Sequence, residues 1–518
     1  MDTKALRQKV LDLAIRGKLV PQDPNDEPAS ALLERIRQLK QQMVKEDKLK
    51  AKDIKNDTVI FVGEDNLHYE KFADGTVKCI EDEIPFDLPD GWAWARLGAV
   101  AEAIGDGDHQ PPPQTSFGIP FLVISNVSGG QLSFENTRFV SEEYFSQLPE
   151  TRKPRNGDLL FTVTGSYGIP VLVDTDDKFC FQRHIAIVRP CIISNRYLYV
   201  VLGSSYVKSI CDAKATGTAQ KTVGLATLRE LLIPVAPYKE QMQIYAQTQD
   251  VLNIVDSISS DKEDLLNIIE NSKAKILDLA IRGKLVPQDP TDEPASVLLE
   301  IIRAEKEELI RQGKIKRDKK ESVIFRGEDN SYYEKIAGKV VNIDDEMPFE
   351  LPVGWMWCRF SEVIELFSGK DLTPDRYSEI PQGIPYITGA SNLENGSVIV
   401  NRWTTSATTH TTVGDLLLTV KGSGVGKMAI CDIEDAHIAR QIMALRCRNG
   451  ITQEYVQIVV SAFLTEITNQ ANGIIPGIRR EVVLGTLFPL PPTSEQLKIS
   501  TKVNCAIGKL QMIEKSLN

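Results

Sequence analysis

The segment KGSGVGKM at residues 421–428 is the closest that the chain comes to a phosphate-binding loop. Such a loop needs Gly at its first position and Ser or Thr directly after its lysine, where the hydroxyl holds Mg²⁺. Lys421 and Met428 occupy these two positions, and the segment does not follow the G-x-G-x-x-G pattern of dinucleotide sites either. The spacing therefore favours a glycine-rich turn between two strands.

Other catalytic patterns are absent from the sequence. The five histidines form no H-E-x-x-H motif and stand at no zinc-site spacing from a cysteine. The eight cysteines form no C-x-x-C pair, and no G-x-S-x-G elbow occurs. The acidic pairs Asp176-Asp177 and Glu434-Asp435 fall in predicted turns, where we expect solvated carboxylates. We therefore predict no catalytic residues and no metal ligands, which favours a recognition or scaffold protein.

Polar and basic residues instead gather at predicted turns, in two sets. Arginine can bridge guanine and glutamine can bridge adenine in the DNA major groove, while Ser, Thr and Lys suit phosphates. Taken singly, each such residue is more often an ordinary surface position, but both sets fall at corresponding turns. We interpret them as candidate DNA contacts: Thr164, Ser166, Tyr167, Gln182, Arg183, His184, Thr218, Gln220 and Lys221 in one set, and Lys421, Ser423, Lys427, Arg440, Gln441, Arg479 and Arg480 in the other.

Charge is distributed in a way that permits local DNA binding. The 518-residue chain carries a formal net charge of -11. Residues 91–237 hold 13 Lys/Arg and 13 Asp/Glu, and residues 354–492 hold 11 and 13, so these two segments together carry only -2. The segments with the candidate contacts are thus the least acidic ones, which is compatible with a DNA-binding groove but does not require one.

An internal repeat places the two sets in equivalent surroundings. Residues 11–34 and 277–300 are identical at 22 of 24 positions and share the sequence GKLVPQDP. The match continues through VIFVGEDNLHYEK and VIFRGEDNSYYEK, and through LPDGWAW and LPVGWMW. Farther along, the identity reduces to isolated anchors. The chain therefore contains two copies of one domain, with matching edges and divergent interiors.

The connectors between these regions are predicted to be helical. Apolar residues recur at heptad spacing across residues 239–283, with polar exceptions, which indicates one helix about 65 Å long. The C-terminal segment repeats the front half of this pattern and the N-terminal segment repeats its back half, so we expect the two ends to complete a second connector. An amphipathic helix packed on its own domain is the alternative. The central seam contains Ile244, Val251, Ile258, Leu265 and Leu279.

The interiors, 91–237 and 354–492, contain short apolar runs bounded by Gly, Pro and Asn, such as DLLFTVTGS and DLLLTVKGS. Such runs are typical of strands joined by turns. RYLYVVLGSSYVKSIC and TQEYVQIVVSAFLTEIT each predict one helix. We predict a mixed α/β domain in each copy, with one curved and largely antiparallel sheet.

The ordered set of motifs resembles the specificity subunit of a type I restriction-modification system, over essentially the whole chain. Each motif alone is weak, whereas the set, repeated in the same order, is specific. Four motifs carry the resemblance in each half: the GKLVPQDP arm, the entries Leu88 to Trp94 and Leu351 to Trp357, the turns Gly165-Ser166 and Gly422-Ser423, and the helix starts Glu240-Gln241 and Glu495-Gln496.

The resemblance implies two homologous target recognition domains, separated by long antiparallel coiled-coil-like helices in a pseudo-two-fold internal repeat. The extensions at about 25–86 and 291–349 depart from it, and we expect them to be a partner surface or a spacer. The implied segments are an N-terminal helical arm (1–20) that completes the second connector, an extension with a charged helix and strands (21–90), the first target recognition domain (91–237), the central long helix (238–286), the second extension (287–353), the second target recognition domain (354–492) and the C-terminal helix (493–518).

The resemblance also implies partners. Each domain would read one half of a bipartite site in double-stranded DNA, and the helices would dock two methyltransferase subunits. Two translocase-nuclease subunits would join where the system also restricts. S-adenosylmethionine, ATP and Mg²⁺ are then expected on the partner subunits, with no cofactor on this chain and no catalysis by it.

Two other functions compete with this hypothesis. A DNA-independent coiled-coil scaffold with two ligand-binding domains is the alternative, and a standalone nuclease or methyltransferase is disfavoured by the missing motifs. The sequence has no run of about 18 apolar residues and no apolar signal segment at its N-terminus. We therefore expect a cytoplasmic chain that does not span a membrane, and the resemblance further implies a bacterial or archaeal cell and association with the nucleoid.

Overall fold

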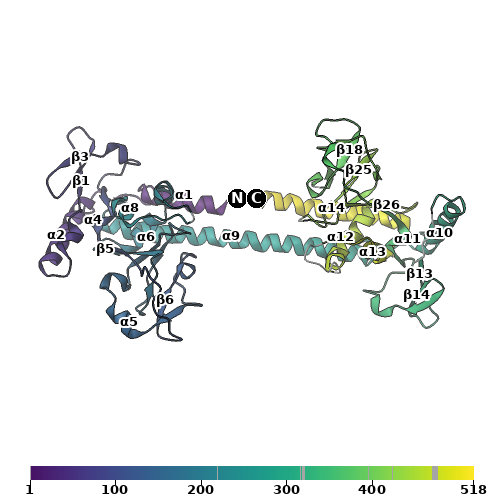
Figure 1. Cartoon of the computed structure of the whole chain (residues 1–518), viewed down its shortest axis with the longest axis horizontal. Helices are drawn as coiled ribbons and strands as arrows, with labels where there is room; N and C mark the ends of the chain where they lie inside the picture. Colours follow the sequence, from purple (N-terminus) through teal and green to yellow (C-terminus); the bar gives the residue numbers. More distant parts are fainter. Residues whose placement is uncertain are drawn as a thin grey trace. The chain divides into compact units, whose positions relative to one another are not determined.

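The computed structural model describes residues 2–517 except 219, 316, 318–320, 395, 423 and 470–476. The chain divides into two compact units, and the boundary between Lys262 and Glu263 falls inside the 44-residue helix α9 (Tyr238–Ile281). Helix α9, which Figure 1 labels, is the long helix that the heptad pattern predicts, within two residues at each end.

In the first unit, helix α1 (Thr3–Ile15) packs along α9. The carboxylate of Asp2 caps α1 by accepting from the backbone N–H groups of Lys4 and Ala5. The buried face of α1, which includes Ala14 and Ile15, shares one apolar core with the first part of α9. Arg7 forms an ion pair with Asp256, and Thr3 lies next to Ser259 farther along α9. Residue numbers therefore rise on one helix as they fall on the other, so the pair is antiparallel.

In the second unit, helix α14 (Thr493–Leu517) packs along the second part of α9 in the same way. Lys273 Nζ lies 2.8 Å from a carboxylate oxygen of Glu514, while Ile499 is buried in one core with Ile281. Leu265 was assigned to the buried seam, but its side chain is 37% exposed. Leu265 precedes Lys273 by more than two helical turns, and α14 ends three residues after Glu514, so α14 does not reach it.

Each extension begins with a 17-residue helix and ends with a three-stranded antiparallel sheet (Figure 1). A helix and strands were expected in both extensions. The first extension contains α2 (Ala29–Lys45), α3 (Ala51–Ile54), β1 (Val59–Val62), β2 (His68–Lys71) and β3 (Val77–Cys79). The second contains α10 (Ala295–Arg311), β13 (Ser322–Arg326), β14 (Tyr332–Ile336) and β15 (Lys339–Asn342).

Each interior is built on a four-stranded antiparallel sheet. Both faces of this sheet are buried, one against helices and the other against a second small sheet. The continuous apolar runs LLFT and LLLT explain this, because alternate residues of a strand point to opposite faces. The orders are β5 (Ala101–Asp106), β11 (Ile185–Pro190), β8 (Leu159–Thr162), β9 (Pro170–Leu172) in the first unit and β17 (Ile364–Ser368), β26 (Ile442–Cys447), β23 (Leu416–Thr419), β24 (Met428–Ile430) in the second.

The second sheet of each interior was not predicted. It contains one parallel pair, β6 with β10 in the first unit and β18 with β25 in the second, so the expectation of one sheet is wrong, whereas the pairing is largely antiparallel as expected. The strands are β6 (Ile119–Leu122), β7 (Arg138–Val140) and β10 (Cys180–Phe181), then β18 (Ile384–Ile387), β21 (Trp403–Thr404), β22 (His410–Thr411) and β25 (Ala436–Ile438), with a hairpin of β19 (Leu393–Glu394) and β20 (Ser397–Val398).

Two-stranded sheets join the start and the end of each interior. They pair β4 (Ala93–Arg96) with β12 (Leu232–Val235), and β16 (Met356–Arg359) with β27 (Leu487–Leu490). The remaining helices are α4 (Leu97–Val100), α5 (Glu142–Gln147), α6 (Asn195–Leu202), α7 (Ser205–Lys214), α8 (Leu225–Glu230), α11 (Phe360–Val363), α12 (Gln453–Asn469) and α13 (Arg480–Gly485).

One predicted helix is two. The segment RYLYVVLGSSYVKSIC contains α6 and α7, separated at Gly203 and Ser204. The Ser204 hydroxyl accepts from the backbone N–H of Val207 and caps α7, which ends the first helix and begins the next. The corresponding segment of the second unit is the single helix α12, as predicted.

Candidate nucleic-acid interface

Three chain segments meet at the end of β8 in the first unit. The backbone N–H of Val163 donates to the carbonyl of His184, 2.9 Å away, on the turn between β10 and β11. The carbonyl of Val163 accepts from the N–H of Val223, 2.8 Å away, on the segment between α7 and α8. The turn after β8, the β10–β11 turn and the α7–α8 segment are therefore held together by backbone bonds. All nine candidate residues of the first set lie on these three segments.

The same three segments meet at the end of β23 in the second unit. The backbone N–H of Val420 donates to the carbonyl of Gln441, 2.8 Å away, and the carbonyl of Val420 accepts from Ile478, 2.9 Å away. Val420 thus takes the place of Val163, and the turn between β25 and β26 takes the place of the β10–β11 turn. Two interiors with little sequence identity share one backbone scaffold at this point.

The side chains on the shared scaffold differ between the units. Counting from the matched bonds, Thr164 corresponds to Lys421, and His184 corresponds to Gln441. Two polar positions are the same in both sequences: Ser166 matches Ser423, and both units have arginine, Arg183 or Arg440, one residue before the bonded carbonyl. A common scaffold with exchanged polar side chains suits two readers of different sequences, because base-edge contacts depend on the side chain.

The two arginines have different surroundings. The Arg440 guanidinium lies 2.6 Å from a carboxylate oxygen of Asp371, and both side chains are exposed, 69% and 47%. Exposed pairs of this kind contribute little to stability, so the pair can open to accept another anion. Arg183 is also exposed, and within the described part of the chain its guanidinium makes no ion pair. Beside it, burial and the Arg183 charge lower the pKa of His184, so this ring is neutral at pH 7 and can donate or accept one hydrogen bond.

The other predicted residues fall into three groups. The first group is exposed, as a direct contact requires, apart from the half-buried Gln182. Its exposed members are Ser166, Thr218, Gln220, Lys221, Lys421, Lys427, Gln441 and Arg479. Ser423 lies outside the described residues. The remaining three are bonded within their units: the Thr164 hydroxyl to that of Thr222, the Tyr167 hydroxyl to Asp212, and Arg480 to the carbonyl of Leu366.

Arg480 has a structural reason for its position. Leu366 lies on β17, an edge strand whose outer carbonyls lack a neighbouring strand. In the first unit, Arg229 donates in the same way to the carbonyl of Ile104 on the edge strand β5, 2.6 Å away. These arginines therefore cap the sheet edge, and sequence reasoning did not distinguish them from surface arginines.

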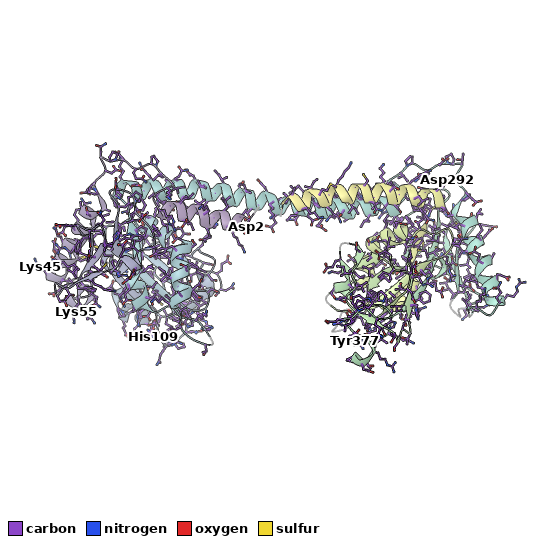
Figure 2. All side chains as sticks on the ribbon, turned by 90° about the horizontal axis from the view of Figure 1, so that it is seen from above. Asp2, Lys45, Lys55, His109, Asp292 and Tyr377 are labelled. Atoms are coloured by element: carbon purple, nitrogen blue, oxygen red, sulfur yellow. The ribbon has the colours of Figure 1, made fainter. Side chains whose placement is uncertain are left out.

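Sequence reasoning also missed one loop beside each arginine turn. Asp108 bonds through its backbone to both Phe181 and Arg183, and Lys370 bonds to Ile438, so these loops flank the β10–β11 and β25–β26 turns. His109 is 58% exposed on the first loop, and Figure 2 labels it at the edge of its unit. A proline-rich sequence gave no pattern that would place this loop beside Arg183.

The repeated motifs form a joint in each unit, which we define as the contact of the GKLVPQDP arm, the tryptophan entry and the helix that begins with Glu-Gln. In the first unit, the Glu240 carboxylate accepts from Trp92 Nε1 at 2.9 Å and from Gln22 Nε2 at 3.2 Å. Gly17 ends the arm's helix with φ +62°, and a Cβ there would collide with the ring of Pro89. Burial raises the pKa of Glu240.

The second unit repeats the joint atom for atom. Glu495 accepts from Trp355 Nε1 at 2.9 Å and from Gln288 Nε2 at 3.2 Å, and burial raises its pKa too. Gly283, at φ +64°, takes the place of Gly17. The near-identity of the arms thus has a packing reason.

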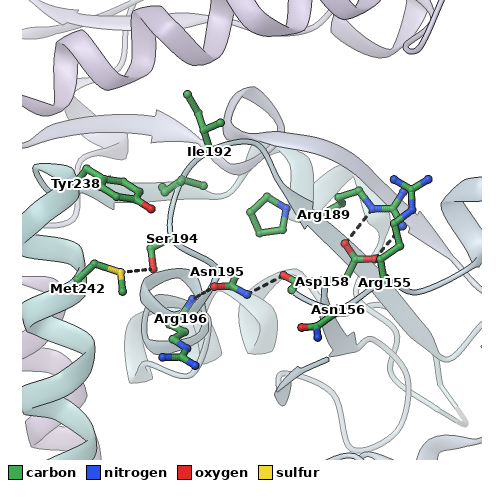
Figure 3. Close-up of a pocket in the computed structure, with 13 residues that line it drawn as sticks. Arg155, Asn156, Asp158, Arg189, Ile192, Ser194, Asn195, Arg196, Tyr238 and Met242 are labelled. Carbon is green, nitrogen blue, oxygen red and sulfur yellow. Dashed lines mark hydrogen bonds and ion pairs between the residues drawn. The ribbon is translucent and has the colours of Figure 1, made fainter. Parts of the chain in front are cut away.

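A hollow of about 400 Å³ lies next to the first joint, where the interior meets α9 (Figure 3). Its wall contains the buried ion pair of Asp158 with Arg189, 2.8 Å apart, which the second unit repeats as Asp415 with Arg446. The backbone N–H of Ser194 donates to the side-chain oxygen of Gln241 at 3.0 Å. These contacts fix the interior to the helix and explain the Gly-Asp and Glu-Gln motifs.

Among the described residues, no group of three or more His, Cys, Asp or Glu side chains is arranged to hold a metal ion. None of the helices in the described ranges is both long enough and apolar enough to cross a membrane.

Comparison with known proteins connects these features. Residues 89–267 match the model of the type I restriction modification DNA specificity domain. The specificity subunit of the type I restriction enzyme EcoAI from Escherichia coli is 27% identical, over 99% of this chain and 91% of that subunit. The EcoEI specificity subunit from Escherichia coli is 26% identical, over 96% of this chain and 88% of that subunit.

A solved structure shares the fold. A chain from a study of complex assembly and conformational transition of the type I R-M system has a TM-score of 0.54, with 18% identity over 84% of this chain and 94% of that one. The mixed helix and strand architecture is thereby confirmed. With a matching domain model and two relatives of one kind that align along most of the chain, this chain is similar to the specificity subunits of type I restriction-modification systems.

Proposed function

We propose that this chain reads DNA sequence for a type I restriction-modification enzyme, with one half of a bipartite site read by each interior. The observation that carries the proposal is the shared scaffold at Val163 and Val420, which presents different side chains in the two units. Two half-sites of different sequence need this combination of one backbone and two sets of contacts.

In this function the candidate residues divide by chemistry. Arg183, Arg440, Gln182 and Gln441 suit base edges, whereas Ser166, Lys221, Lys421 and Lys427 suit phosphates. The two interiors have a net charge near zero, so no large negative charge repels DNA from these contacts. The more acidic remainder of the chain would contact protein partners.

The helices have the second role in the proposal. Helix α9 spaces the two readers, and α9 with α1 and α14 docks two methyltransferase subunits; translocase-nuclease subunits join in systems that restrict. S-adenosylmethionine, ATP and Mg²⁺ bind to those partners. This chain positions the methyltransferases on DNA and performs no chemistry.

The test is a DNA titration of the chain with its methyltransferase at several salt concentrations. Phosphate contacts release counterions, so the logarithm of the affinity for any DNA should fall linearly with the logarithm of the salt concentration, while a specific duplex stays tighter than a scrambled one. The specific duplex is found by mapping methylated bases in DNA from cells that express the pair. Salt-independent binding, or no methylated sequence, would favour the DNA-independent scaffold instead.

A further inference from the structure

The three-stranded sheet of each extension turns one face to its own unit and the other to solvent. In the first unit, Ile60 and Glu70 point inward, since Ile60 packs on the core of Trp94 and Glu70 forms an ion pair with Arg96, 2.6 Å away. Residues alternate between the faces along a strand. The outward face is therefore Val59, Phe61, Tyr69, Lys71, Val77 and Cys79, and its counterpart is Val323, Phe325, Tyr333, Lys335, Val340 and Asn342.

The outward faces match better than the inward faces. Five of the six outward positions are identical in the two units, and Cys79/Asn342 is the exception. Of the five paired inward positions only two match. The inward pairs are Ile60/Ile324, Val62/Arg326, His68/Tyr332, Glu70/Glu334 and Lys78/Val341.

Folding alone does not explain the outward match. Packing restricts positions that meet a core, and the two inward pairs that match, Ile60/Ile324 and Glu70/Glu334, are positions of this kind. A solvated position tolerates most substitutions, as the inward but exposed Val62 and Val341 do, yet the solvated outward face stays the same between copies. It is also apolar, with Val77 and Val340 each 53% exposed and Phe61 41% exposed. An exposed apolar face that folding does not need indicates a binding surface.

The aromatic pair at the centre of each outward face is held rigidly. The rings of Phe61 and Tyr69 stack with centroids 5.9 Å apart, and those of Phe325 and Tyr333 do the same. The Tyr69 hydroxyl donates to Asp65 at 2.7 Å, and Gly63 leaves room for the ring, since a Cβ there would lie 2.8 Å from it. The repeated Gly-Glu-Asp sequence builds this support.

The second unit holds its pair by the same contacts. The Tyr333 hydroxyl donates to Asp329 at 2.8 Å, and a Cβ on Gly327 would lie 2.7 Å from the ring. Side chains that are already fixed lose little entropy when a partner covers them. Each outward face is thus preorganised for a contact.

We propose that the two outward faces are twin docking surfaces for one protein subunit that binds this chain in two copies. DNA does not fit, because the half-sites differ while these faces are the same, and because Asp65 and Asp329 lie beside the aromatic pairs. The fitting partner presents an apolar patch with a carboxylate opposite Lys71 or Lys335. The inference rests on the proposed function, in which the twice-bound subunit is the methyltransferase.

Phe61→Glu and Phe325→Glu, singly and together in the full chain, test the proposal by native mass spectrometry with the purified methyltransferase. The unchanged chain should carry two copies. Each single variant should bind one copy as before and the other roughly tenfold to hundredfold more weakly, since a central aromatic anchor is lost. The double variant should weaken both. Val77→Glu and Val340→Glu, on the same faces, should act alike.

Val62→Arg and Val341→Lys are the matched controls. Both residues are more than half exposed, but on the inward side of the register, and each takes the residue type of the other copy. These variants should bind two copies with unchanged affinity.

Two copies bound at full affinity by the double variant would overturn the docking surfaces. So would a loss of DNA affinity or of self-association with normal methyltransferase binding, because the face would then serve DNA or a second copy. These outcomes leave the proposed function standing. That function fails separately, if the unchanged chain with its methyltransferase shows no sequence-specific DNA binding.

Discussion

Arg183 and Arg440 stand at the same place on the shared scaffold, and they can reach DNA at different cost. Arg183 makes no ion pair within the described residues, whereas Arg440 must first leave Asp371. Both follow the short second-sheet strand and precede the strand that pairs in the main sheet. Each arginine lies 18 residues after the glycine of its Gly-Ser turn, Gly165 or Gly422, so the sequence alone predicts that the two positions are equivalent.

Arg183→Ala and Arg440→Ala should each weaken binding to the specific duplex. For a guanine contact we expect a loss of about 1–3 kcal/mol and relaxed specificity at one base pair, in opposite halves of the site. Fluorescence anisotropy with single-base variants of the duplex measures both effects. Lys178→Ala, before β10 instead of after it, is the control. Unchanged affinity in both arginine variants would make these residues structural.

Glu240 is a buried acid whose only role in the structure is to join the arm to the helix. Burial raises its pKa in the folded chain, so the carboxyl is protonated more readily there than in the unfolded chain. Its contribution to stability is therefore complete below the unfolded pKa and is lost as pH rises through the folded pKa.

Glu240→Gln should consequently cost least at high pH. The glutamine side chain can keep only one of the two hydrogen bonds that Glu240 accepts, which lowers the free energy of unfolding by about 1 kcal/mol at every pH. Unlike Glu240, it never carries a buried charge. The deficit in Tm of the variant relative to the unchanged chain should thus narrow as the pH rises above about 4.5, the ordinary pKa of a glutamate. Glu135→Gln, at an exposed side chain, should show no such trend. A deficit that widens with pH would contradict the raised pKa.

At the residue scale, the sequence predicted where the polar turns lie but not which side chains are free. It placed Thr164, Tyr167 and Arg480 with the DNA candidates, and the structure bonds all three within their units. A hydroxyl or guanidinium finds such a partner only after distant segments meet, so spacing along the chain does not reveal it.

At the element scale, the helices with continuous periodicity were predictable and the sheet arrangement was not. Helix α9 follows from its heptads, while the break between α6 and α7 depends on one Ser cap. The split into two sheets depends on the parallel pairs of two-residue strands such as β10, which leave almost no pattern. The GKLVPQDP repeat was visible in the sequence, but its reason, the joint, required the fold.

The joint gives an element-scale prediction. Gly17→Ala and Gly283→Ala place a Cβ in the left-handed region and against the ring of Pro89 or Pro352. Each should lower the free energy of unfolding by about 1–3 kcal/mol, measured by denaturant titration. Gly129→Ala has open space around its Cβ and should be close to neutral. Equal stability of all three variants would remove the packing explanation for the repeated arm.

At the scale of the whole molecule, the repeat separates what is common from what is individual. The arms, joints and extension faces match between copies, and most of the polar side chains on the interior scaffold do not. We interpret the common parts as surfaces for a partner bound twice, and the individual parts as readers of two different half-sites. In this interpretation each interior reads its half-site independently of the other.

Exchange of residues 91–237 for the interior of another specificity subunit tests that claim most directly. Strands β4 and β12 both lie inside this segment and pair with each other, so the transplanted interior brings its own two-stranded sheet. The hybrid is expressed with the methyltransferase, and modified-base sequencing maps the methylated site. If each interior reads its own half-site, one half of the methylated site should change and the other half should be retained. A change in both halves, or in neither, would contradict independent reading.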